Sequence, residues 1–441
     1  MSDKNKKTKY GFLNPVRWPF FYGWVVVFFG TLGMLMSAPG QTIGVSAFTN
    51  HLIDAMDISR VNLSLAYLFG TIASASLLST AGRVYDRWGA RVTGPLASLG
   101  LGLVLIALSQ IDHLTQFLGG LLRFLPHSWL AFAMLALAFL GIRFFGQGLT
   151  TLVARNMLMK WFVRRRGLVN GIRGAFVAFG FSSAPKLFDM MIESSSWRYA
   201  WLGMGLFIGI LFSLLALLFY RDNPQQFGLE PDGGMAGPQH AKMRKAQPDI
   251  DYDLPQARRC YSFWVFLGGM ALFALYNTAM AFHIVSIFGA ADMSKDQATM
   301  IFIPGAIIAV TGNIIFSWLS DYIKLKYLLY VLLGGIALST GSMFFLRDGM
   351  PVITLIIGNG VMAAVFGLLL SVTWPRFFGV THLGAISGYA LGFVVAASAV
   401  GPYLFSLSNS LTGGYGAGAL SCFLAAALLL AGALRADNPS E

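Results

Sequence analysis

Apolar runs of about twenty residues recur along the chain, and each is long enough to cross the hydrocarbon core of a bilayer. In such a core every backbone N–H and C=O group must be paired within its own segment, so isolated runs of this length form helices. The pattern predicts an all-α membrane protein of twelve transmembrane helices. The predicted spans are residues 21–44, 62–84, 90–110, 129–155, 168–191, 198–220, 262–287, 297–319, 326–346, 352–374, 383–406 and 411–434.

The composition excludes a soluble fold. Hydrophobic residues make up 56% of the sequence and charged residues only 11%, against about 25% charged residues in soluble domains. A net charge of +12 would suggest nucleic acid as the partner of a soluble protein. Here the basic residues lie in short loops between apolar runs, so we expect a lipid bilayer and a small-molecule substrate as partners, and no nucleic acid.

The distribution of Lys and Arg sets the predicted orientation. With a cytosolic N-terminus, the inner segments hold 22 basic residues and the outer loops hold five. Basic residues collect on the cytosolic side of membrane proteins. We therefore expect a multi-pass protein of the inner (plasma) membrane with both termini in the cytosol. The basic N-terminus leads into a run too long for a signal-peptide core and lacks a clear cleavage site, so we expect it to be retained.

Two segments interrupt the pattern of spans. Residues 221–261 are polar and rich in Pro and Gly, which predicts a cytosolic linker between an N-terminal bundle, 1–220, and a C-terminal bundle, 262–441. Residues 111–128 are too short and too interrupted to span, and their Leu and Phe residues favour an element at the outer interface. An ordinary extended loop is the alternative.

Two loop sequences occur once in each half. Asp86 in GRVYDRWGAR and Asp321 in SWLSDYIKLK are 235 residues apart. Gly167 in KWFVRRRGLVNG and Gly384 in RFFGVTHLGAISG are 217 apart. The difference of 18 residues equals the length of 111–128. That stretch is therefore interpreted as an insertion into one copy of a duplicated six-helix unit, an arrangement typical of transporters.

These loops resemble the major facilitator superfamily, whose first cytosolic signature has Gly, three residues, Asp, Arg, one residue, Gly and two basic residues. Ala90 replaces the first of the two basic residues. GIRFFGQG in the fourth span is similar to the family pattern there. The resemblance implies secondary active transport by rocking of two bundles, often as a monomer, with a latch that breaks when the bundles rock. The latch residues implied here are Gly82, Asp86, Arg87, Gly89, Arg91, Asp321 and Lys324.

A narrower resemblance concerns the substrate. FYGWVVV in the first span, WFVRRRGLVNGI after the fourth and HIVSIFGAADMS after the seventh resemble monocarboxylate transporters and oxalate-formate antiporters. This implies a small organic anion, a monocarboxylate or dicarboxylate, moved with a proton or in exchange for another anion. Many carriers of that branch have an Arg in the eighth span, and MIFIPGAIIAVTGNIIFSW has none. Export of uncharged amphipathic compounds is the alternative function, and a non-transporting sensor on a carrier scaffold is another.

Arg143 lies near the middle of the fourth span, where an unpaired guanidinium costs at least about 2.5 kcal/mol. None of the 19 acidic residues falls at a predicted membrane centre. Two interpretations remain open: Arg143 donates hydrogen bonds to carbonyl groups at a helix end, or an anionic substrate supplies the counter-charge.

Other polar residues within the spans need a partner, an interface or a wet cavity, and we treat them as candidate substrate contacts. They are Trp24, Gln41, Tyr67, Tyr276, Asn277, Asn313 and Tyr389. Helix-to-helix contacts are the structural alternative for each. His283, toward the outer end of the seventh span, is the candidate for proton coupling, with a purely structural role as the alternative. The sequence has no nucleophile motif, phosphate loop or zinc spacing, so we expect no enzyme activity, cofactor or metal.

Overall fold

The computed structural model describes residues 14–122, 124–233 and 251–439, and these are helical with short connections. The N-terminal tail and the middle of the predicted linker lie outside the described residues. Among the described residues, eleven helices are long and apolar enough to cross a membrane. They confirm the all-α membrane fold, with a shorter helix, α1 (Gly23–Met36), in place of the first predicted span.

The chain packs as two compact units. Of the described residues, those from 14 to Arg165 and from Phe176 to Gly233 form the N-terminal unit. Arg166–Ala175 belongs to the C-terminal unit, together with residues 251–439. After α1, the long helices of the first half are α4 (Arg60–Trp88), α5 (Ala90–Leu108), α7 to α8 (His127–Trp161), α9 (Arg166–Ser194) and α10 to α11 (Trp197–Phe219). Those of the second half are α14 (Tyr261–Gly289), α15 to α16 (Lys295–Leu319), α17 (Leu325–Phe344), α18 (Met350–Phe377), α19 (Leu383–Thr412) and α20 (Gly416–Ala433).

The first predicted span, 21–44, is not one continuous helix. After α1 come a 3-10 turn, η3 (Ala38–Gly40), and the short helices α2 (Thr42–Ser46) and α3 (Thr49–Met56). Pro39 cannot donate a backbone hydrogen bond, which favours a break at this point. The break brings the carbonyl of Gly40 into the interior of the N-terminal unit, where Gly40 is buried.

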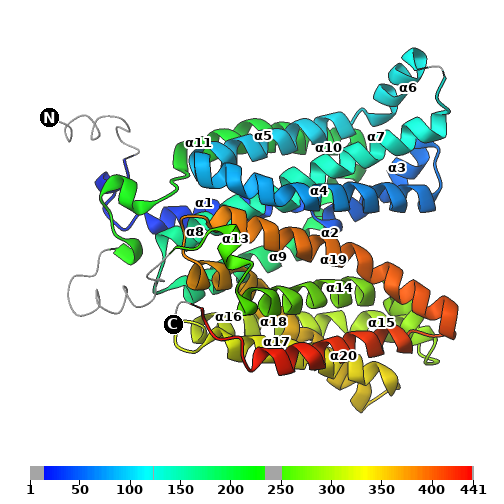
Figure 1. The fold of residues 1–441 in the computed structure, drawn as a ribbon. Coiled ribbons are helices and arrows are strands. Elements are labelled where there is room, and N and C mark those ends of the chain that lie inside the picture. The colour runs from blue at the N-terminus through cyan, green and yellow to red at the C-terminus, as the bar shows by residue number, and fades with distance from the viewer. Residues whose placement is uncertain (1–13, 123, 234–250, 440–441) are drawn as a thin grey trace. The chain divides into compact units, whose positions relative to one another are not determined.

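The fourth span contains a second irregularity. Its α-helical parts, α7 (His127–Ile142) and α8 (Thr151–Trp161), flank a π-helical stretch, η4 (Arg143–Thr150). Such bulges widen a helix by one residue per turn and occur frequently at functional sites. α7 packs against α4, and α8 packs against α1 (Figure 1).

Within the C-terminal unit, four pairs of helices have extensive contacts. α14 packs against α19, and α18 packs against both α16 and α17. α20 packs against α17 and lies beside it in Figure 1.

The segment 111–128 is not an extended loop. Residues Ile111–Leu121 form a helix, α6, at the far end of α5 and α7 (Figure 1). Large apolar side chains are exposed here, among them Phe117, Leu121 and Phe124. Asp112 joins this helix to α10, because both Nη atoms of Arg198 donate to its carboxylate, one at 2.6 Å.

Candidate functional site

Arg143 is at the start of the π-helical stretch and is almost completely buried. Its Nη1 atom donates to the carbonyl oxygen of Gly40 and to Oγ1 of Thr42, both at 3.3 Å. The guanidinium carbon lies 5.3 Å from the centre of the Tyr67 ring, within the range of a cation–π contact. The Tyr67 and Thr42 hydroxyls are 2.9 Å apart. The site is therefore a cationic centre held by neutral oxygens and an aromatic face.

Two glycines allow this arrangement. A Cβ atom on Gly40 would lie 2.7 Å from Cα of Gly146, and one on Gly146 would lie at the same distance from Cα of Gly40. Both distances are too short for non-bonded carbon atoms, so the two backbones touch only because both residues lack a side chain. This contact holds η3 against η4 and brings the Gly40 carbonyl within reach of Arg143.

The other two candidate substrate contacts of the first half, Gln41 and Trp24, lie in different places. Gln41 lies beside Thr42 at the break, and its Nε2 atom donates to Oγ of Ser37 at 3.0 Å. Trp24 is at the start of α1, where its ring packs edge-on against Phe162 with centroids 5.6 Å apart. The structure thus brings Arg143 and Tyr67 together, with Gln41 adjacent in the chain. It places Trp24 elsewhere.

In the C-terminal unit, Asn277 lines a pocket of about 210 Å³ between α14, α16 and α18. Asn359 lines the same pocket, and its Oδ1 atom accepts a hydrogen bond from Ser339 at 3.0 Å. Tyr276 is buried behind the pocket, with its hydroxyl 2.7 Å from Oγ of Ser339. The pocket therefore offers uncharged carboxamides, and Tyr276 supports it through Ser339 without lining it.

The remaining candidates of this half engage protein groups. Nδ2 of Asn313 donates to the carbonyl of Ala364 at 2.9 Å. The Tyr389 ring lies under the guanidinium of Arg258, 5.1 Å from its carbon to the ring centre. Nε2 of His283 lies 3.0 Å from the carbonyl of Pro402 and 3.2 Å from Oγ of Ser406, so it is held against α19. None of these three lines the Asn277 pocket.

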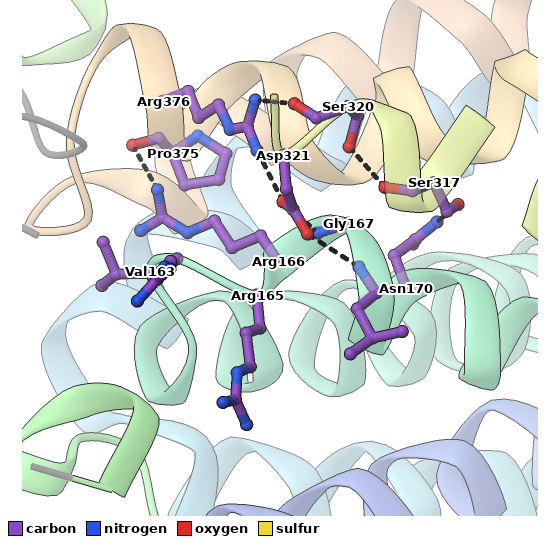
Figure 2. Close-up of polar contacts among 12 residues, drawn as sticks. Val163, Arg165, Arg166, Gly167, Asn170, Ser317, Ser320, Asp321, Pro375 and Arg376 are labelled. Atoms are coloured by element: carbon purple, nitrogen blue, oxygen red, sulfur yellow. Dashed lines mark hydrogen bonds and ion pairs between the residues drawn. The ribbon is translucent and has the colours of Figure 1, made fainter. Parts of the chain in front are cut away.

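Asp321 is the centre of a polar cluster in the C-terminal unit (Figure 2). Its carboxylate accepts hydrogen bonds from the backbone nitrogens of Gly167 at 2.9 Å and Leu168 at 3.1 Å, in the first turn of α9. Arg376 of α18 donates to the same carboxylate at 2.8 Å, and also to the carbonyl of Ser320. One carboxylate thus caps a helix N-terminus and pairs with an arginine.

Neighbouring contacts reinforce this cluster. Asn170 donates to Oγ of Ser317 at 3.3 Å, and Arg166 donates to the carbonyl of Pro375 at 3.3 Å (Figure 2). A Cβ on Gly167 would overlap the carbonyl of Ser317, so only glycine fits here. The first segment of α9 is therefore fixed to α16 and α18.

The predicted latch residues of the first half lie at the junction of α4 and α5. Gly82 is buried in α4, Asp86 is half-buried, and Arg87 is exposed. Gly89, with φ of 72°, ends α4 in the left-handed region that favours glycine, and Arg91 donates to the carbonyl of Leu217 at 3.4 Å. The latch candidate Lys324, in the second half, is the residue immediately before α17 begins.

Sequence reasoning missed several residues of these sites. Thr42 is a small side chain in an apolar run, and its role appears only with the break in the first span. Asn359 is an amide in another apolar run, and its role appears only because it lines the Asn277 pocket. Arg376 is one of the 22 basic residues of the inner segments, and its ion pair with Asp321 has no signal in the sequence. No spacing rule in the sequence connects residues 321 and 376.

Two bundles of long apolar helices, with polar and charged groups buried inside them, define a polytopic membrane protein. Residues 114–402 match the family model described as Major Facilitator Superfamily. This match covers more than half of the chain, which therefore belongs to the major facilitator superfamily. It is a multi-pass membrane protein and a secondary transporter.

A relative among known proteins is human Monocarboxylate transporter 12, which is 26% identical over 298 residues, covering 60% of this chain. The aligned region is 55% of that protein, so the chain spans about half the length of this relative. The likeness agrees with the resemblance of the loops to the monocarboxylate transporter branch.

Solved structures of the family share the fold. The proton:xylose symporter XylE, bound to 6-bromo-6-deoxy-D-glucose, superimposes with a TM-score of 0.63 at 16% identity, covering 95% of this chain and 98% of that one. A double-tryptophan XylE variant gives a TM-score of 0.60 at 16% identity, covering 94% and 95%. At this identity the likeness concerns the fold alone.

Proposed function

We propose that this transporter moves a small organic anion, a monocarboxylate or dicarboxylate, and that Arg143 binds the carboxylate. The observation that carries the proposal is the environment of the guanidinium. Within the described part of the chain, the groups that contact it are the Gly40 carbonyl, the Thr42 hydroxyl and the Tyr67 ring, and none is a carboxylate.

The geometry leaves the guanidinium able to take a ligand. Its Nε atom is buried and has no hydrogen-bond partner among the described residues. An arginine side chain can hold a carboxylate through two parallel N–H donors, and this pairing is strongest away from water. Thr42 is exposed and Tyr67 is half-buried, so the two residues beside the buried charge are not closed off from the surface. An entering carboxylate would find a cation and two hydroxyl groups.

The human relative supports this substrate class through its name, Monocarboxylate transporter 12. The second candidate function is export of uncharged amphipathic compounds. The Asn277 pocket favours it, because the polar groups that line this pocket are carboxamides and none is charged. In that case Arg143 has a structural role, donating to the carbonyl of Gly40 at the break in the first span.

The transport cycle we propose is alternating access. Residues 1–220 rock against residues 262–441 about the linker 221–261, and the latch residues stabilise one state. The excess of basic residues in the inner segments supports cytosolic termini, and the membrane in this proposal is the inner (plasma) membrane. The transporter works as a monomer, and a proton or an exchanged anion is the coupled solute.

A melting-temperature screen of the purified protein tests the substrate class. A ligand that binds only the folded protein raises its stability by mass action. We expect small carboxylates to stabilise the wild-type protein at pH 6 and pH 7.5, and this effect to disappear in Arg143→Lys. Stabilisation by neutral amphiphiles alone would favour the exporter.

A further inference from the structure

Asp232, at the end of the first part of the linker, holds the loop between α8 and α9. Its Oδ2 atom accepts hydrogen bonds from the backbone nitrogens of Val163 at 3.0 Å and Arg164 at 2.9 Å, and Oδ1 accepts one from Arg165 at 3.3 Å. The side chain is buried, and its backbone has a φ of 58°, in the left-handed region. Asp tolerates this region better than most residues. Three loop donors thus converge on one carboxylate.

Asp251, at the other end of the described linker, does the same for the loop between α18 and α19. Oδ1 accepts a hydrogen bond from the backbone nitrogen of Val380 at 3.1 Å, and Oδ2 accepts one from the hydroxyl of Thr381. Gly379 has a φ of 81°, and a Cβ atom there would overlap the Asp251 carboxylate. Only glycine at 379 allows the carboxylate to approach so closely.

The two loops are equivalent in the internal repeat. Val163 and Val380 are separated by 217 residues, the same offset as Gly167 and Gly384. The same backbone amide in each half therefore donates to an aspartate of the linker. Carboxylates that accept backbone N–H bonds form charge-assisted contacts, which are about twice as strong as neutral ones. The linker thus contacts one equivalent loop in each half through a carboxylate.

The position of Asp232 has a consequence for α9. The three backbone amides that donate to Asp232, those of Val163 to Arg165, come immediately before Arg166, where α9 begins. The next amides, of Gly167 and Leu168, donate to Asp321. The 163–165 loop and the first turn of α9 are consecutive in the chain. Fixing the loop therefore sets the orientation of the N–H groups in that first turn. Asp251 is placed in the same way before α19, which begins at Leu383.

We propose that Asp232 and Asp251 are positioning residues of the transport cycle. Each holds the loop before the fifth helix of its half, and so orients the first turn of α9 or α19. Neither residue belongs to the Arg143 site. The proposal therefore concerns the rate of the conformational cycle and is independent of which solute is carried.

Hydrogen exchange of the purified full chain tests this without a substrate. In Asp232→Ala we expect the amides of 163–165 to exchange about tenfold faster, and the amides of Gly167 and Leu168 to follow by a similar factor. Asp232→Asn keeps one acceptor oxygen and should give an intermediate effect. In Asp251→Ala the amides of Val380, Gly384 and Ala385 should respond instead. Asp253→Asn is the matched control, because Asp253 caps only its own short helix, α13 (Leu254–Ala257), and Asn is also a good cap.

A second measurement separates positioning from local capping. With radiolabelled pyruvate as the probe in liposomes, the double Ala variant should lower the maximal rate about fivefold and leave KM within about twofold, because neither aspartate contacts the solute. Thr381→Val removes one Asp251 contact without altering a carboxylate, and provides a milder variant if Asp251→Ala does not fold.

If the amides of Gly167 and Leu168 exchange at the wild-type rate while those of 163–165 exchange faster, Asp232 is a local cap only and the proposal is wrong. If pyruvate is not carried at all, the anion proposal fails. The hydrogen-exchange rates still decide whether Asp232 and Asp251 are positioning residues.

Discussion

The carboxylate of Asp321 accepts a hydrogen bond from the backbone nitrogen of Gly167 at 2.9 Å, and so caps the N-terminus of α9. The first amides of a helix lack partners within it, and the helix dipole favours a negative charge at that end. The same carboxylate pairs with Arg376 at 2.8 Å. The signature loop of the second half is thus a three-way junction of α9, α16 and α18, and its aspartate is the shared acceptor.

Asp321→Asn should weaken this junction. The amide keeps one acceptor oxygen but loses the charge that Arg376 and the helix end require, so we expect a loss of about 1–3 kcal/mol in the free energy of unfolding. Chemical denaturation in detergent measures it. Arg376→Gln and the double variant complete a thermodynamic cycle, in which additive losses would show that the two side chains are not coupled.

Gly146→Ala should destabilise the Arg143 site. The added methyl group would push η4 away from Gly40 and cost about 1–3 kcal/mol, as other insertions into packed interiors do. Gly203→Ala in α10 is the control, because a Cβ there meets nothing within 4 Å. Melting temperatures and uptake of both variants check this. Equal behaviour of the two variants would mean that the contact between η3 and η4 is not required.

The Asp112–Arg198 pair should make stability depend on pH. The hydrogen bonds from Arg198 hold the pKa of Asp112 below its usual value. The pair therefore stabilises the folded protein above about pH 4, the ordinary pKa of Asp, and this contribution is lost as pH falls through the lowered pKa. In Asp112→Asn the melting temperature should fall less between about pH 5 and pH 3 than in the wild type. Asp54→Asn, which alters an exposed acid in α3, should retain the wild-type slope.

His283 is the candidate for coupling transport to protons. Histidine changes charge near neutral pH, and here the ring is held by Pro402 and Ser406 and lies 5.3 Å from the ring of Tyr415. If it carries the coupled proton, His283→Gln should flatten the dependence of uptake on external pH between about 6 and 8. His127→Gln, at the start of α7, is the control. A wild-type pH profile in His283→Gln would assign the histidine a structural role.

Much of the fold could be predicted from the sequence, because span length and the placement of Lys and Arg are local properties. The repeat also indicates that the Asp86 loop of the first half and the Asp321 loop of the second half are equivalent. The partners of Arg143 could not be predicted, since they depend on the break at Pro39 and Gly40 in another helix. The role of Arg376 and the contacts of Asp232 and Asp251 likewise depend on residues far apart in the chain. Among the candidate contacts, Asn277 and Tyr276 are adjacent polar residues of one span, and the sequence could not show that Asn277 lines a pocket and Tyr276 does not.

Uptake of radiolabelled pyruvate and lactate into liposomes by wild-type and Arg143→Lys protein tests the central claim most directly. Lysine keeps the charge but cannot hold a carboxylate through two parallel donors, so we expect uptake to fall at least about tenfold, with the melting temperature of the unliganded protein unchanged. Arg155→Lys, which alters another buried arginine of the same span, should retain uptake. Wild-type affinity and rate in Arg143→Lys would contradict the account and would leave Arg143 as a structural partner of the Gly40 carbonyl.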